Sequence, residues 1–217
     1  MTTDISSALA PFGLILRGGF HIAPDDQVPL PGETMLLIGN AGSAMWRIFA
    51  DQAKDEPNPL DNWTRQSLDK IAEDFGAKAL YPFGGPPFLP FQRWAMKAEA
   101  VYPSPVGPLI HPIYGLWHAY RGALVFAQNI ELPERAEAVS PCDSCSEKYC
   151  IKVCPAGVFV AGKYDVPLCL GELKRPGNEC SERGCLSRHA CPIGQDYAYA
   201  PDHANFHMQA FKRGFGI

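Results

Sequence analysis

The pattern of apolar and polar positions divides the chain into a regular part and an irregular part. Helical spacing of apolar residues is found over residues 4–16, 42–50, 61–76 and 91–100. Short apolar runs bounded by turn residues indicate strands at residues 32–40, 77–83, 106–111 and 117–127, with a turn at 112–115. Strands interleaved with helices predict an α/β or α+β layered fold. From Pro141 onward this periodicity disappears.

The change of pattern predicts two domains, 1–137 and 138–217, separated at the charged segment 131–137. The second domain has too little apolar periodicity to build its own core, so cross-links of some kind must stabilise it. All eight cysteines lie in this domain, between Cys142 and Cys191. A secreted fold stapled by disulfides would distribute its cysteines more widely, so the clustering indicates a local site.

Composition and charge limit the kinds of partner and cellular compartment that we expect for this protein. Hydrophobic residues make up 47% of the 217 residues and the net charge is -4, which is typical of a globular protein. The acidic isoelectric point, near 5.8, disfavours a nucleic-acid partner. The acidic start and the position of Arg17 do not fit a signal peptide, and no apolar run reaches the roughly 18 residues of a membrane span. We therefore expect a cytoplasmic protein without a membrane partner.

The spacing of the cysteines indicates iron-sulfur chemistry. The first group reads C-x2-C-x4-C-x3-C-P, which differs from the bacterial ferredoxin run C-x2-C-x2-C-x3-C-P only in its middle gap. In two-cluster ferredoxins the fourth cysteine of such a run binds the other cluster. This logic predicts two [4Fe-4S] clusters in a ferredoxin-like module. One would be held by Cys142, Cys145, Cys150 and Cys191, and the other by Cys154, Cys169, Cys180 and Cys185.

Two alternatives remain open at this point. C-x2-C pairs also form four-cysteine zinc sites, which would make the module a structural one. The widened second group could also leave one cluster incomplete, giving a single cluster.

The segment 106–133 resembles a cobalamin-binding superfamily. It carries Ile110-His111-Pro112, Gly115, Trp117 and Gly122 at the family's Ile-His-Pro-x-x-Gly-x-Trp-x-x-x-x-Gly spacing. The superfamily includes the cobalamin-processing CblC (MMACHC) proteins, the epoxyqueuosine reductases and the reductive dehalogenases. The pair Arg121-Gly122 and residues 130–133 are most similar to CblC, as is a weaker match at residues 20–21 and 29–32. The order of this segment and a two-cluster module resembles epoxyqueuosine reductase.

The resemblance implies a nitroreductase-like α+β domain that binds cobalamin. It further implies that the corrin contacts are made by His111, Pro112, Tyr114, Gly115 and Trp117. The alternative for His111 is a turn histidine bonded to backbone, and for Tyr114 and Trp117 it is ordinary core packing. Epoxyqueuosine reductases have an acidic proton donor in a segment that aligns near Gly85, where residues 83–87 contain no acid. The resemblance therefore does not extend to their tRNA-modifying chemistry.

Together these observations predict an oxidoreductase that binds a corrinoid and iron-sulfur clusters. Electrons from an external donor would reduce the corrinoid, and the outcome would be decyanation or dealkylation at its upper axial ligand. One alternative is a cobalamin-dependent reductase of an organic substrate, with Tyr81, Tyr114 or His118 as the proton donor. Another is a ferredoxin-type electron carrier or a zinc-stabilised scaffold.

Overall fold

The computed structural model describes residues 1–132, 134–160 and 162–217 and groups them into two compact units. Unit 1 contains Met1–Ala100 and His118–Ala138, and unit 2 contains Val101–Trp117 and Val139–Ile217. These units differ from the two expected segments, because residues 101–117 group with the cysteine-rich part of the chain.

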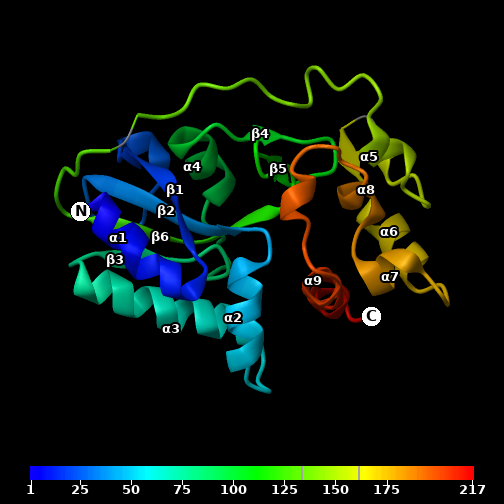
Figure 1. Cartoon of the computed structure of the whole chain (residues 1–217), viewed down its shortest axis with the longest axis horizontal. Helices are drawn as coiled ribbons and strands as arrows, with labels where there is room; N and C mark the ends of the chain where they lie inside the picture. Colours follow the sequence, from blue (N-terminus) through cyan, green and yellow to red (C-terminus); the bar gives the residue numbers. More distant parts are fainter. Residues whose placement is uncertain (133, 161) are drawn as a thin grey trace. The chain divides into compact units, whose positions relative to one another are not determined.

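Unit 1 is built on a four-stranded antiparallel sheet in the order β1-β2-β6-β3 (Figure 1). The strands are β1 (Ile15–His21), β2 (Thr34–Ala41), β3 (Lys78–Leu80) and β6 (His118–Phe126). The central pair β2 and β6 runs in register from Thr34 opposite Phe126 to Ala41 opposite His118, with a bulge at Ile38 and Gly39. Every residue of β2 except the last is buried, which requires cover on both faces of the sheet.

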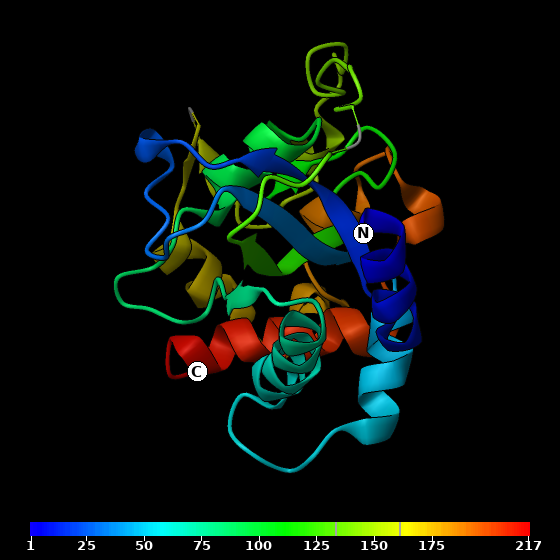
Figure 2. The same cartoon turned by 90° about the vertical axis from the view of Figure 1, so that its left-hand side faces the viewer.

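Helices provide that cover. Helix α4 (Phe91–Ala98) contacts β1 and β2, whereas α3 (Pro59–Asp74) contacts β3 and β6. Figures 1 and 2 show α3 and α4 on opposite faces of the sheet. The remaining helical elements of unit 1 are α1 (Thr2–Leu9), η1 (Ala10–Phe12), η2 (Pro24–Asp26) and α2 (Ala44–Gln52). The antiparallel sheet with covering helices confirms the α+β class.

Two expected elements of unit 1 are wrong in extent. The helix expected over residues 4–16 ends at Leu9 and continues as the 3-10 segment η1 to Phe12, where Gly13 adopts a left-handed conformation (φ 62°) and the chain turns into β1. The helix expected from Asp61 begins at Pro59, after Asn58. Asp61 lies in its first turn and pairs with Arg121 at 3.0 Å.

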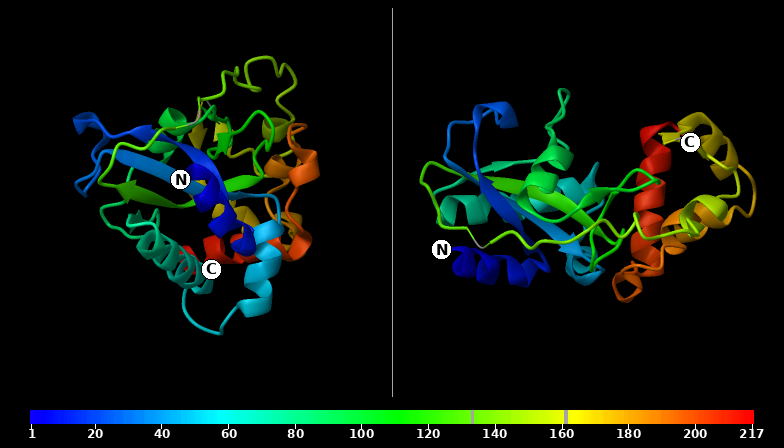
Figure 3. Two further views of the ribbon diagram at one scale, coloured as in Figure 1. Left: turned by 60° about the vertical axis from the view of Figure 1, so that its left-hand side comes forward. Right: turned by 90° about the horizontal axis from the view of Figure 1, so that it is seen from above.

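Unit 2 consists of short helices and two small hairpins. The helices are α5 (Tyr149–Lys152), α6 (Val166–Leu173), α7 (Glu179–Arg183), α8 (Leu186–His189), η3 (Gln195–Tyr197) and α9 (Pro201–Gly214). The hairpins pair β4 (Tyr102–Pro103) with β5 (Leu109–Ile110) and β7 (Phe159–Val160) with β8 (Lys163–Tyr164). Helix α9 lies beside α7 (Figure 3). The strand expected at 106–111 is thus reduced to two residues.

The segment 101–117 belongs to unit 2 because its apolar side chains pack there. Val106, Ile110 and Leu116 form a small core with Cys191. The backbones of Gly115 and Gly194 also meet closely, since a Cβ atom on Gly115 would lie 1.9 Å from the Ile193 carbonyl oxygen. Both glycines have positive φ, so this contact and the backbone conformation together explain why residue 115 is a glycine. In the described part of the chain, no helix is long and apolar enough to cross a membrane.

Candidate iron-sulfur and corrinoid sites

The eight cysteines line two separate cavities in unit 2. The first cavity has a volume of about 180 Å³, and the four cysteines around it are Cys142, Cys145, Cys150 and Cys191. Its other walls include Ile110, Pro192 and Ile193. The set that surrounds this cavity is the first set expected from the cysteine spacing.

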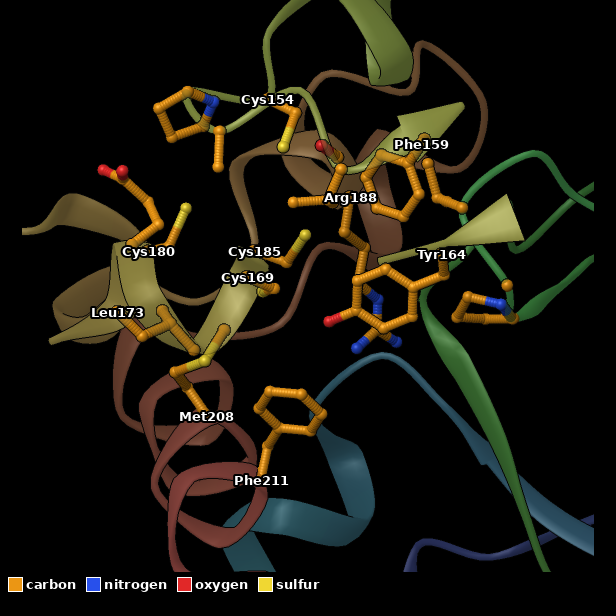
Figure 4. A pocket seen from close by; sticks show the side chains of 18 residues that line it. Cys154, Phe159, Tyr164, Cys169, Leu173, Cys180, Cys185, Arg188, Met208 and Phe211 are labelled. Atoms are coloured by element: carbon orange, nitrogen blue, oxygen red, sulfur yellow. The ribbon is translucent and has the colours of Figure 1, made fainter. Parts of the chain in front are cut away.

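The second cavity has a volume of about 330 Å³ and is lined by Cys154, Cys169, Cys180 and Cys185 (Figure 4). These cysteines come from four different places: the turn after α5, helix α6, helix α7 and the residue before α8. The cavity is walled by apolar side chains, among them Leu173, Met208 and Phe211, the last two from α9. Cys154 lies four residues after Cys150 in the sequence but lines the other cavity, so the two sets interlock.

Side-chain caps hold two of these helices in place. Asp165 precedes α6 and accepts a hydrogen bond from the Leu168 N–H at 2.9 Å, which fixes the helix that carries Cys169. Asn178 precedes α7 in the same way, accepting from the Ser181 N–H at 2.9 Å beside Cys180. Short helices that are marginal alone therefore present their cysteines at defined positions.

The environment of five of the eight thiols disfavours their ionisation. Burial, with a smaller contribution from the neighbouring cysteines, raises the pKa of the Cys180 thiol to about 11. Burial also raises the pKa values of the thiols of Cys142, Cys150, Cys169 and Cys191. Four thiolates around one apolar cavity would repel one another, so a positively charged centre is needed to hold them in that form.

Two polar atoms in unit 2 are buried without a hydrogen-bond partner among the described residues. They are the hydroxyl of Ser187, which lines the second cavity, and the indole Nε1 of Trp117. Such orphaned groups are rare in native proteins, and each requires an explanation such as a ligand that binds there. Of the two residues, Ser187 lines a cysteine cavity and Trp117 lines neither of them.

The thiol arrangement fits a multi-atom cluster. In each set the four thiols surround a cavity, and each cavity is several times the roughly 30 Å³ share of one water molecule. Among the described residues, no three His, Cys, Asp or Glu side chains are close enough together to share one metal ion. A four-cysteine zinc site would instead place its thiolates about 2.3 Å from one point.

The expected corrin-contacting residues all lie in unit 2 and have structural partners there. The ring Nδ1 of His111 accepts hydrogen bonds from the backbone N–H groups of Ile113 at 3.0 Å and Tyr114 at 3.1 Å. Its ring stacks on Tyr114 with 4.3 Å between centroids. Pro112 lies in the same turn, which closes through paired backbone hydrogen bonds between His111 and Gly115. His111 is thus a turn histidine, whatever else it contacts.

Trp117 is fully buried in an aromatic cluster. Its ring packs 5.4 Å from that of Tyr199, and the Arg188 guanidinium lies over both rings. Arg188 also donates to the Leu116 carbonyl through Nε at 2.8 Å, and it lines the second cavity. Arg188 therefore joins the expected corrin segment to the second cysteine set. Corrin contact by His111, Pro112, Tyr114, Gly115 or Trp117 remains a prediction.

Two of the alternative proton donors lie in unit 1 and are engaged in hydrogen bonds. The Tyr81 hydroxyl donates to Asp69 at 2.6 Å, and burial together with this bond raises the Tyr81 pKa well above its usual range. The Nδ1 atom of His118 lies 3.2 Å from Nη2 of Arg17. Because a guanidinium only donates, Nδ1 is the acceptor and Nε2 carries the ring proton.

The two outlying matches to the CblC family meet in unit 1. His21 Nε2 lies 3.1 Å from the Ile130 carbonyl oxygen, and the Ile130 N–H donates to the Thr34 hydroxyl at 3.0 Å. The motif residues thus connect the end of β1 to the segment after β6. Pro133, the last residue of this match, lies outside the described residues.

The sheet of unit 1 and the two cysteine cavities of unit 2 define a protein with the fold of epoxyqueuosine reductases and CblC. No family model and no curated protein sequence matches the chain. Epoxyqueuosine reductase from Streptococcus thermophilus gives a TM-score of 0.56 at 13% identity, covering 94% of this chain and 69% of that one. The C. elegans B12-trafficking protein CblC, a human MMACHC homologue, gives 0.56 at 14% identity, covering 95% and 91%.

A third similar structure is epoxyqueuosine reductase with an epoxyqueuosine-modified tRNA-Tyr stem loop, at a TM-score of 0.56 and 16% identity. It covers 93% of this chain and 68% of that one. These similarities confirm the α+β fold expected from the resemblance of residues 106–133. The ferredoxin-like nature of the cysteine-rich module stays a prediction. They do not support the expected absence of a nucleic-acid partner, since one protein of this fold was solved with RNA.

Sequence patterns do not indicate Ser187, Tyr164 or Arg188. All three line the second cavity, and among its lining residues only the cysteines belong to a recognisable sequence motif. A serine next to a cysteine motif carries no signal by itself, and only the buried, unpartnered state of its hydroxyl distinguishes it.

Proposed function

We propose that this protein holds two [4Fe-4S] clusters in unit 2 and uses them to reduce a bound corrinoid, releasing its upper axial ligand. The observation that carries this proposal is the division of the eight cysteines into two four-cysteine cavities, in the interlocked order typical of two-cluster ferredoxins. Cys142, Cys145, Cys150 and Cys191 would hold one cluster, and Cys154, Cys169, Cys180 and Cys185 the other.

The clusters supply one-electron transfer at low potential. With cyanocobalamin as substrate, one electron reduces the cobalt, the cobalt–carbon bond breaks, and cyanide leaves as an anion that takes a proton from water. Held by the two cysteine sets, the clusters would pass on the electron of an external donor. No side-chain acid is needed for this step. This agrees with the structure of unit 1, where the side chains of Tyr81 and His118 are hydrogen-bonded to Asp69 and Arg17.

The buried indole of Trp117 supports a corrinoid as the substrate. Its N–H has no acceptor among the described residues, whereas the rim of a corrin carries many amide carbonyl groups. Trp117 also belongs to the motif that resembles the cobalamin-binding superfamily. The resemblance and the orphaned donor therefore point to the same residue.

A reductase of an organic substrate is the second candidate. Two epoxyqueuosine reductase structures match this chain with the same TM-score as CblC, 0.56. The loop at residues 83–87 lacks the acid that those enzymes are expected to use, which favours corrinoid processing.

The test is anaerobic addition of cyanocobalamin to the purified, chemically reduced protein, followed by absorption spectroscopy and a cyanide assay. We expect the corrin spectrum to shift to a base-off form on binding and cyanide to be released on reduction. Absence of any spectral shift would overturn the assignment of a corrinoid. Binding without cyanide release, combined with reduction of an added organic substrate, would favour the second candidate.

Two variants separate binding from electron transfer. Cys154→Ala lacks one of the proposed clusters, so at saturating cobalamin we expect it to release cyanide more slowly than the unchanged protein does. Trp117→Phe keeps an aromatic ring but removes the N–H, so we expect it to weaken cobalamin binding about fivefold, the value of one neutral hydrogen bond. Normal cobalamin affinity in Trp117→Phe would show that the Trp117 N–H does not bind the corrinoid.

A further inference from the structure

The second cavity has a buried hydroxyl group that no described residue satisfies. Ser187 is 1% exposed and lines this cavity beside Cys185, the residue that precedes α8. Its Oγ has no hydrogen-bond partner among the described residues. Leaving a buried hydroxyl unpaired costs about 1–3 kcal/mol, so a partner within the cavity is expected.

A second hydroxyl reaches the same cavity from the hairpin of β7 and β8. The Tyr164 hydroxyl donates a hydrogen bond to Cys169. The Tyr164 ring stacks on Phe159 with 5.3 Å between centroids, and the two residues are paired across the hairpin. Figure 4 shows the Tyr164 side chain directed toward the cysteines of this cavity. The hydroxyl is thus held against one of the expected cluster ligands.

Two polar side chains that line the first cavity instead donate hydrogen bonds to backbone carbonyl groups. The Ser144 hydroxyl donates to the Pro141 carbonyl at 3.4 Å and is exposed. The Lys148 ammonium group donates to the Cys142 carbonyl. The two cavities therefore share a four-cysteine arrangement, but the buried hydroxyl without a described partner, that of Ser187, lines the second.

We propose that Ser187 and Tyr164 donate hydrogen bonds to the cluster held by Cys154, Cys169, Cys180 and Cys185, and thereby raise its reduction potential. Ser187 donates to a sulfur of the cluster, and Tyr164 donates to the thiolate of Cys169. This inference rests on the proposed clusters. Reduction adds one electron to the cluster, and a hydrogen bond to its sulfur stabilises the more negative state, so each donor favours the reduced form.

The experiment is a potentiometric titration of the holoprotein with dithionite, followed by electron paramagnetic resonance, on four forms of the chain. These are the unchanged protein, Ser187→Ala, Tyr164→Phe and the control Ser144→Ala. We expect Ser187→Ala and Tyr164→Phe each to move one of the two cluster potentials to a more negative value and to leave the other unchanged. Ser144→Ala is expected to change neither potential.

Exchange into deuterated water gives a second readout that does not depend on activity. The unchanged protein should show an exchangeable proton coupled to the reduced second cluster in electron-nuclear double resonance, and Ser187→Ala should lack it. Unchanged potentials and couplings in both Ser187→Ala and Tyr164→Phe would overturn the inference while leaving the clusters in place. Absence of iron and acid-labile sulfide from the unchanged protein would instead overturn the proposed function.

Discussion

Unit 1 and unit 2 obtain their stability in different ways. Unit 1 contains no cysteine and encloses a sheet whose central strand is buried along nearly its whole length, with Met35, Leu36, Leu37 and Ile38 fully inside. Unit 2 has short helices and small separate cores, such as that of Val106, Ile110 and Leu116 with Cys191. The second cavity of unit 2 has apolar walls, and four of the cysteines line it.

The difference indicates a division of labour between folding and chemistry. A unit with its own apolar core folds without a cofactor, whereas a unit whose cysteines face cavities depends on what fills them. Unit 2 also contains the turn from His111 to Gly115 that the resemblance associates with the corrin. The cysteine cavities and this turn are therefore parts of one structural unit.

The largest effect should follow from removal of iron. Treatment with a chelator and an oxidant should increase amide exchange strongly over residues 139–217 and leave the peptides of β2 and β6 protected, because the proposed clusters lie in unit 2. Hydrogen-exchange mass spectrometry measures both at once. Equal protection of unit 2 with and without iron would contradict this difference between the units.

The interlocked pairing of the cysteines gives the next largest effect. Cys154→Ala should lose about four iron atoms per chain, and the double variant Cys154→Ala with Cys180→Ala should lose no more, since the proposal assigns both residues to the same cluster. The double variant Cys150→Ala with Cys154→Ala should lose about eight iron atoms, although its two residues are close in sequence. Iron analysis by mass spectrometry distinguishes these outcomes, and the reverse result would show sequential pairing.

A core substitution in unit 1 tests the independence of the two units. Leu37 is fully buried in β2, so Leu37→Ala should reduce the free energy of unfolding of unit 1 by about 2–5 kcal/mol without changing the iron content. Leu168→Ala, at a half-exposed position of α6, is the control and should leave unit 1 unchanged. Loss of iron in Leu37→Ala would show that the units are energetically coupled.

The smallest effect comes from a pair of glycines in unit 2 that differ only in their surroundings. Both Gly115 and Gly177 have positive φ, but a Cβ atom on Gly115 would clash with the Ile193 carbonyl while one on Gly177 would meet nothing within 4 Å. Gly177→Ala should lower the free energy of unfolding of unit 2 by about 1 kcal/mol, from backbone strain alone. Gly115→Ala should lower the same free energy by about 3 kcal/mol. Denaturant-induced unfolding of unit 2 measures both values. Equal costs would argue against the close backbone contact at Gly115.

The sequence predicts the central strands well and the edges of unit 1 poorly. Residues 32–40 and 117–127 have continuous apolar runs, and β2 and β6 form there. The sequence pattern does not predict strand β1, because Arg17 interrupts its run of apolar residues. The structure buries Arg17 and pairs it with Glu99 at 2.7 Å, a partner 82 residues away that no local pattern indicates.

The candidate site shows the same limit. The spacing of Cys142, Cys145 and Cys150 predicts the two cysteine sets because close ligand spacing is a local property of the chain. The role of Gly115 in packing has no local signal, since it depends on Gly194. Ser187 has no pattern of its own, and only its burial in the folded unit draws attention to it.

The most direct test of the central claim is the metal and sulfide content of the protein purified without oxygen. The two cavities predict about eight iron atoms and about eight acid-labile sulfides per chain, with the electron paramagnetic resonance signal of two interacting [4Fe-4S] clusters after reduction. Zinc in place of iron, or about four iron atoms with a single isolated cluster signal, would contradict the assignment of two clusters.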